Sequence, residues 1–113
     1  FETVLAEKIE TILSRGTGNS RAKDFFDIYA ISTKDGTNLD NNLLQKAFTN
    51  TMIHRNSMMS KENAFDILEE LRDSAQLSQI WNKYQKQASY VPNLSFDDTC
   101  DAIETLLNQV YRE

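Results

Sequence analysis

The sequence predicts an all-α fold, as a single helical bundle-like domain of five to six helices over residues 1–113. Glycine and proline, which interrupt helices, occur only three times and once. Hydrophobic residues recur at the i, i+3, i+4 spacing of a helix face, and runs of β-branched residues are scarce. A hydrophobic content of 40% with 26% charged residues is typical of a folded domain rather than a disordered segment.

Three helices are predicted in the first half of the chain. The first covers residues 2–15 and ends at the breaker-rich segment GTGNS. The second covers residues 20–31 with Ser20 as its N-cap, and Asp40 caps a third helix that runs to about His54. The apolar face of the third helix is predicted to contain Leu44, Ala47, Phe48 and Met52.

Three more helices are predicted in the second half. Ser60 caps the fourth, and the fifth covers residues 75–88 before Pro92 prevents its continuation. Ser95 caps the last helix, whose first turn carries acidic residues that complement the helix dipole. The apolar positions expected to be buried are Ala64, Ile67, Leu68, Leu71, Leu77, Ile80, Trp81, Tyr84, Phe96, Cys100, Ile103, Leu107 and Val110.

The charge balance and the single cysteine limit the functional classes. A net charge of −5 opposes a broad nucleic-acid-binding surface, although a local basic patch could still bind phosphate. Cys100 cannot form an internal disulfide, and no apolar run is long enough to span a membrane. We therefore expect a cytoplasmic protein without a membrane partner. Because the sequence enters a helix directly after Phe1, we also expect it to be a fragment of a longer protein.

The first helix places cations where apolar residues are expected. At 100° per residue, Lys8 and Arg15 fall at about 80° and 60°, within an apolar stripe that includes Phe1, Val4 and Leu5. Glu7 and Glu10 fall on the opposite side, which we expect to be solvated. A lysine in the apolar sector reaches water, pairs with a carboxylate of a neighbouring helix, or points with Arg15 into a cleft that holds phosphate.

The second helix carries matching carboxylates in the stretch RAKDFFDIY. Asp24 lies at the border of its aromatic face, and Asp27 lies one step outward. The spacings of Arg21 to Asp24 and Lys23 to Asp27 are i,i+3 and i,i+4, so ion pairs within the helix could account for all four charges. Two carboxylates are too few for a metal site, and we assign no metal ligands.

Other chemically active residue types point to structural roles. His54, the only histidine, falls near the end of the third helix, and nothing in the sequence pairs it with a nucleophilic residue. Cys100 lies on an apolar stripe, which predicts a buried and unreactive thiol. The sequence contains no glycine-rich phosphate loop, zinc-ligand spacing or nucleophile elbow.

Two motifs resemble the AbiEii/AbiGii family of nucleotidyltransferase-like toxins, within the DNA polymerase β-like superfamily. They are L-A-E-K-x-x-x-I-x-x-R in the first helix and S-R-x-K-D-x-x-D after the GTGN loop. The resemblance covers residues 1–31, as the third and fourth family motifs, and residues 32–113 fit the helical C-terminal portion of such proteins. It implies a bacterial toxin–antitoxin or abortive-infection role in phage defence. It also implies that Lys8 contacts nucleotide phosphates and that Asp24 lies beside the nucleotide, with Arg15, Arg21, Lys23 and Asp27 as phosphate-binding or supporting residues.

The first two family motifs, a Gly-Ser turn and a D-x-D pair on a sheet, have no counterpart in these 113 residues. The resemblance therefore implies a missing N-terminal nucleotidyltransferase portion that binds Mg²⁺ with a nucleoside triphosphate. We expect this chain alone to be inactive and without cofactors. The implied partners of the intact protein are an antitoxin protein and a tRNA acceptor. The alternative is a non-enzymatic helical module that binds a protein partner, for which amphipathic helices with modest acidic charge suffice.

Overall fold

The computed structural model describes residues 1–18, 21–34 and 39–111, which form six α-helices and one short 3₁₀ helix. No strand occurs among these residues, and the predicted all-α fold is confirmed. The elements are α1 Glu2–Arg15, η1 Gly16–Gly18, α2 Ala22–Lys34, α3 Asn41–His54, α4 Lys61–Asp73, α5 Ala75–Gln87 and α6 Phe96–Val110.

The predicted N-caps of three helices are confirmed. The Asp40 side chain accepts hydrogen bonds from the first backbone N–H groups of α3, and Ser60 does the same for α4. At α6, Ser95 accepts from the N–H of Asp98 while the Asp98 carboxylate accepts from the N–H of Ser95, which completes a capping box. Ser20, the predicted cap of the second helix, lies outside the described residues.

The second helix extends beyond its predicted end at Ile31, because α2 continues to Lys34. Ser32 and Thr33 commonly favour helix ends, since their hydroxyls compete for backbone groups. Here both hydroxyls instead donate to the carbonyl of Tyr29, at 3.1 and 2.8 Å, within the last turns of the helix. The competing groups are therefore satisfied without ending α2.

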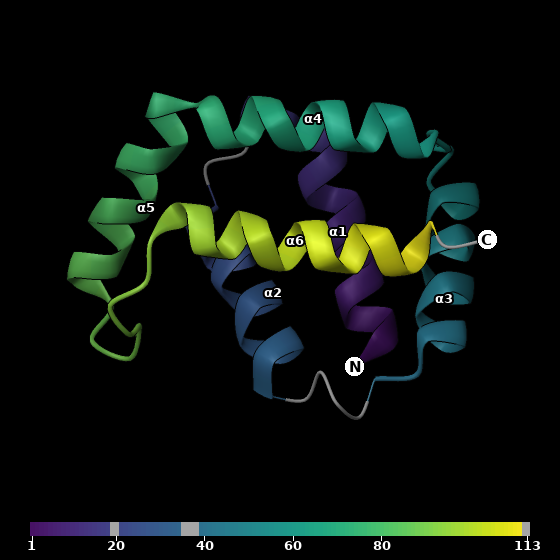
Figure 1. Ribbon diagram of the computed structural model, residues 1–113, viewed down its shortest axis with the longest axis horizontal. Helices are drawn as coiled ribbons and strands as arrows, with labels where there is room; N and C mark the ends of the chain where they lie inside the picture. Colours follow the sequence, from purple (N-terminus) through teal and green to yellow (C-terminus); the bar gives the residue numbers. More distant parts are fainter. Residues whose placement is uncertain (19–20, 35–38, 112–113) are drawn as a thin grey trace.

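Helix α6 crosses the middle of the molecule, with α4 alongside it and α1 behind (Figure 1). It packs against α2, α3, α4 and α5, whereas α1 packs against α2, α3 and α4. The radius of gyration is 13.4 Å, and a compact chain of this length is expected to have about 13 Å. The first three helices therefore share one core with the rest of the described chain.

The core contains the apolar faces predicted for α3 to α6. Phe48, Leu68, Trp81 and Ile103 are essentially inaccessible to solvent. The indole N–H of Trp81 donates to the carbonyl of Leu94 at 2.8 Å, so the largest core side chain leaves no unpaired donor. This core fixes α1 and α2 relative to each other.

The buried face of α1 differs from the predicted one. Phe1 and Val4 are exposed by 68% and 45%, whereas Ala6 and Leu13 are buried on the other side of Ile9. With residue number multiplied by 100°, the buried face is centred at roughly 200° rather than near the predicted 100–140°. Lys8 and Arg15 thus lie at the margin of this face, and the prediction that they fall inside it was wrong. A margin position lets a cation touch both protein and solvent.

Candidate functional site

Lys8 of α1 faces two carboxylates of α2. Its Nζ lies 3.4 Å from Oδ1 of Asp24 and 3.1 Å from Oδ2 of Asp27. The side chain of Lys8 is about one-quarter exposed, so its ammonium reaches both the carboxylates and solvent. Of the explanations open at the sequence level, pairing with a neighbouring helix is therefore confirmed. Contact with phosphate stays a prediction.

The two ion pairs predicted within RAKDFFDIY are also present. Lys23 Nζ lies 2.9 Å from Oδ2 of Asp27, and Arg21 Nε lies 3.7 Å from Oδ2 of Asp24. The Asp27 carboxylate holds the pKa of Lys23 above its usual value, chiefly through their hydrogen bond. Asp27 therefore serves two lysines, one on its own helix and one on α1.

Asp24 differs from Asp27 in burial, because only 5% of Asp24 is exposed. A buried carboxylate is costly unless charged or hydrogen-bonding groups replace its water. Asp24 obtains them from Lys8 and Arg21, and its place in the first turn of α2 adds the favourable end of the helix dipole. It is one of few buried charged residues in the described chain, and it adjoins an open cavity.

That cavity lies between α1, the start of α2 and the end of α3. Its volume is about 260 Å³, and its lining includes Lys8 and Asp24. Two acidic side chains contribute to the lining, and four basic ones outnumber them. The acidic residues are Glu7 and Asp24, and the basic residues are Lys8, Arg15, Arg21 and Arg55. Although the chain has a net charge of −5, basic side chains are in excess at this hollow, which favours an anion there. We call it the cationic pocket.

Arg15 is exposed in the last turn of α1, where a cation also complements the helix dipole. The pocket therefore joins four of the six predicted site residues, namely Lys8, Asp24, Arg15 and Arg21. Lys23 and Asp27 lie beside it and support Lys8 through the shared Asp27 carboxylate.

Arg55, which the sequence patterns did not indicate, completes the pocket from the position directly after α3. Its Nη1 donates to Oε1 of Glu10 and, at 3.0 Å, to Oγ1 of Thr11. Glu10 is only 3% exposed, so the prediction that it faces solvent was wrong. Burial alone raises the pKa of Glu10, but hydrogen bonds from Ser14 and Arg55 outweigh burial and lower it below 4.5. Ala6 and Leu13 were the missed signal, because they extend the buried face of α1 toward Glu10.

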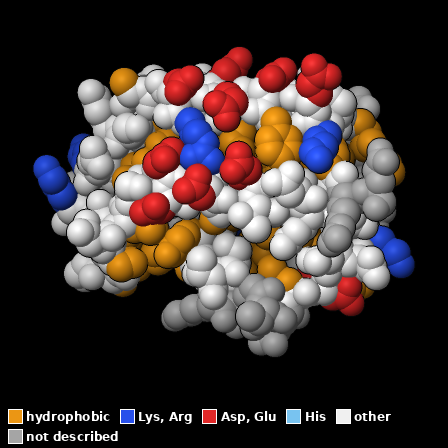
Figure 2. Space-filling view, viewed as in Figure 1, with side chains coloured by type: hydrophobic (Ala, Val, Ile, Leu, Met, Phe, Trp, Pro, Cys, Tyr) orange, Lys and Arg blue, Asp and Glu red, His pale blue; other side chains and the backbone are white. Residues whose placement is uncertain are grey.

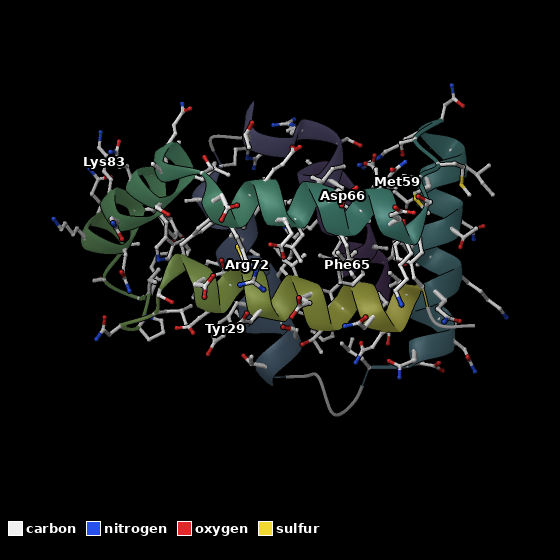
Figure 3. All side chains as sticks on the ribbon, turned by 45° about the horizontal axis from the view of Figure 1, so that its top comes forward. Tyr29, Met59, Phe65, Asp66, Arg72 and Lys83 are labelled. Carbon is white, nitrogen blue, oxygen red and sulfur yellow. The ribbon has the colours of Figure 1, made fainter. Side chains whose placement is uncertain are left out.

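A second arginine, Arg72 of α4, forms a different kind of cluster. Its Nη1 pairs with Asp97, and its Nη2 pairs with Asp101 and Glu104 of α6. Figure 2 shows acidic side chains gathered around basic ones over α4 and α6, and Figure 3 places Arg72 between these helices. Burial by itself lowers the pKa of Arg72, but the carboxylates outweigh this effect and raise it. Arg72 thus joins two helices rather than lining a cavity.

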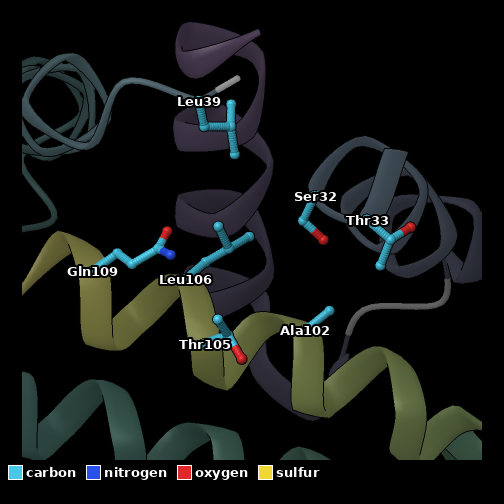
Figure 4. Close-up of a pocket in the computed structure, with 7 residues that line it drawn as sticks. All are labelled: Ser32, Thr33, Leu39, Ala102, Thr105, Leu106 and Gln109. Atoms are coloured by element: carbon cyan, nitrogen blue, oxygen red, sulfur yellow. The ribbon is translucent and has the colours of Figure 1, made fainter. Parts of the chain in front are cut away.

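Another cavity, of about 290 Å³, lies between α2 and α6 (Figure 4). Its lining offers hydroxyl and amide groups but no charged side chain among the described residues. The lining residues are Ser32, Thr33, Leu39, Ala102, Thr105, Leu106 and Gln109. This composition does not favour a phosphate. A further hollow, of about 460 Å³ between the start of α2 and α5, is lined by Arg21, Lys23 and Lys83 but by neither Lys8 nor Asp24. The cationic pocket, which joins Lys8 with buried Asp24, is therefore the candidate site.

The predicted burial of Cys100 is confirmed, because its exposed fraction is 0%. Burial raises the pKa of its thiol to about 12, which suppresses the reactive thiolate. His54 is exposed in the last turn of α3, outside the lining of the cationic pocket.

Neither a metal centre nor a membrane span is found in the part of the chain that the structure describes. No three acidic, histidine or cysteine side chains there are grouped so that they could hold a metal ion. The described residues therefore do not fit a Mg²⁺ site. None of the helices described combines the length and apolar character that crossing a membrane requires.

Fold and site together define an all-α domain in which a lysine, paired with a buried aspartate, lines a cationic pocket. The family model described as "Nucleotidyl transferase AbiEii toxin, Type IV TA system" matches residues 1–107. The chain belongs to this AbiEii family of nucleotidyltransferase toxins from toxin–antitoxin systems. An antitoxin is accordingly its expected counterpart. No curated protein and no solved structure matches the chain.

Proposed function

We propose that this chain forms one wall of the nucleotide site of a toxin that transfers nucleotides. The observation that carries the proposal is the cationic pocket, in which Lys8 lies against buried Asp24 within an acidic protein. The phosphates of a nucleoside triphosphate are the anions that such a pocket suits, and family membership supports this substrate class.

Lys8 is the proposed phosphate-contacting residue. Its side chain is about one-quarter exposed, so the ammonium can approach a phosphate oxygen while it stays paired with Asp24 and Asp27. Negative charge that builds on the phosphates during transfer is stabilised by a cation already in position, without the cost of moving it. Arg15 and Arg21 add positive charge at the edge of the same pocket.

Asp24 is the proposed positioning residue for Lys8. A buried carboxylate attracts the neighbouring ammonium and restricts its position. Asp27 and Lys23 support this arrangement from the outer side of α2. The described residues do not fit a metal ion, so the proposed role of this chain is limited to phosphate contact. The proposed site is completed by a separate carboxylate-bearing part of the toxin.

Growth arrest on induction of the intact toxin tests the proposal. We expect Lys8→Ala and Asp24→Asn to abolish growth arrest at equal expression. The first removes the proposed phosphate contact, and the second removes the carboxylate that positions it. Lys61→Ala is the matched control, since Lys61 lies at the start of α4, outside the lining of the pocket. Full arrest by both pocket variants would contradict the proposal. A transfer assay in vitro, with a tRNA fraction or with protein as the acceptor, would identify what the toxin modifies.

A further inference from the structure

We propose that Arg55 is a second phosphate-binding residue of the cationic pocket, supplied by α3, and that Glu10 positions it. This inference rests on the proposed nucleotide site and adds to it a contact from outside the two motifs of α1 and α2. Its starting point is that Arg55 lines the same cavity as Lys8.

The guanidinium of Arg55 is only partly used by the protein. Nη1 donates to both Glu10 and Thr11. Within the described ranges, Nε and Nη2 have no hydrogen-bond or ion-pair partner. The side chain is 40% exposed and contributes to the lining of the cationic pocket. A guanidinium with two adjacent nitrogens available can bind two oxygens of one phosphate.

Arg72 shows what a purely structural arginine looks like in this fold. Both of its terminal nitrogens are bound to carboxylates, and its side chain is only 16% exposed. Arg55 instead contacts one carboxylate through one nitrogen and borders a hollow in which basic side chains outnumber acidic ones. The ion pair with Glu10 accounts for the contacts of Nη1. It does not account for Nε and Nη2, which are left to bind another group.

Glu10 explains how such an arginine is held in place. Its carboxylate is buried, accepts from Ser14 and Arg55, and has a pKa below the usual value, so it stays ionised at neutral pH. A fixed negative charge behind the guanidinium limits the motion of Arg55 before an anion arrives. Preorganisation of this kind lowers the entropic cost of binding.

Titration of the intact toxin with inorganic triphosphate at low salt, followed by NMR, tests the inference without any substitution. We expect the Nε–H resonance of Arg55 to shift with the same saturation curve as the Lys8 side chain, while that of Arg72 stays unchanged. A response of Lys8 without Arg55 would overturn this inference and leave the proposed function standing. If neither residue responded, both would fail.

Calorimetric titration of variants gives the size of the effect. We expect Arg55→Gln to weaken triphosphate binding about tenfold, because a charge-assisted pair of hydrogen bonds is lost. Arg55→Lys should recover about half of that loss on a logarithmic scale, since it restores the charge but not the fork. Glu10→Gln should weaken binding about threefold by releasing the arginine. Arg72→Gln is the control that should leave affinity unchanged. If Arg55→Gln lowered the melting temperature alone and left affinity unchanged, Arg55 would be structural and the inference wrong.

Discussion

Lys8 on α1 and Asp24 on α2 meet at 3.4 Å, where a partly exposed ammonium covers a buried carboxylate. The contact has two consequences. It joins the two helices that carry the family motifs, and it places a positive charge at the wall of the cationic pocket. Stability and phosphate binding are therefore both expected to depend on this pair.

Because Asp24 is buried, we expect its ion pairs to contribute more to the free energy of unfolding than the exposed pair of Lys23 and Asp27. We expect Asp24→Ala to lower the free energy of unfolding by about 2 kcal/mol, because a buried hydrogen-bonding partner of Lys8 and Arg21 is removed. Lys23→Ala should cost less than about 0.5 kcal/mol, since the lysine is largely exposed. Urea denaturation of the two variants at neutral pH gives both values. If the two variants lost equal free energy of unfolding, the partly buried Lys8–Asp24 pair would not stabilise the fold more than the exposed Lys23–Asp27 pair, and the prediction would be wrong.

Glu10 predicts a specific pH dependence of stability. Because its pKa in the folded state is below the ordinary value of 4.5, its ionised form stabilises the fold above that pH. This contribution is lost as the pH falls from 4.5 through the lower pKa of the folded state. We therefore expect the melting temperatures of the unaltered chain and Glu10→Gln to differ most near pH 6 and to converge below pH 4.5. If the difference in melting temperature grew toward acid pH, the ionised form of Glu10 would not be the one that stabilises the fold, and the prediction would be wrong.

The burial of Cys100 predicts that its thiol is protected from chemical modification. Its thiol is fully buried, and its pKa is raised to about 12, so thiolate is scarce at pH 8. We expect a disulfide exchange reagent such as DTNB to modify it at least about a hundredfold more slowly in the folded chain than in urea. Rapid modification of the folded chain would mean that α6 opens readily or that the thiol is accessible.

The sequence predicted the helices well because their signals are local. Asp40, Ser60 and Ser95 cap helices through side-chain contacts a few residues away, and the apolar spacing of α6 identifies its buried face directly. The continuation of α2 was missed because the hydroxyls of Ser32 and Thr33 can favour either a helix or its end.

The site was only partly predictable for the opposite reason. Lys8 and Asp24 lie in adjacent motifs, so their proximity follows from two consecutive helices. Arg55 lies 45 residues after Glu10, and only the packing of α3 on α1 brings them together. No short-range pattern carries that information. The helical wheel could have indicated the burial of Glu10 only if Ala6 and Leu13 had been weighted above Phe1 and Val4.

The rate of nucleotide transfer by the intact toxin, with and without the Lys8→Ala substitution, shows whether Lys8 acts on the phosphates. The assay would use radiolabelled nucleoside triphosphates, Mg²⁺ and total RNA, with circular dichroism to confirm the fold of the variant. We expect the rate to fall about 100- to 1,000-fold, because a preorganised positive charge is lost from the cationic pocket. Lys61→Ala should retain the full rate. If a folded Lys8→Ala toxin transferred nucleotide within a few-fold of the original rate, Lys8 would not act on the phosphates. That result would favour a role of this chain in binding a protein partner.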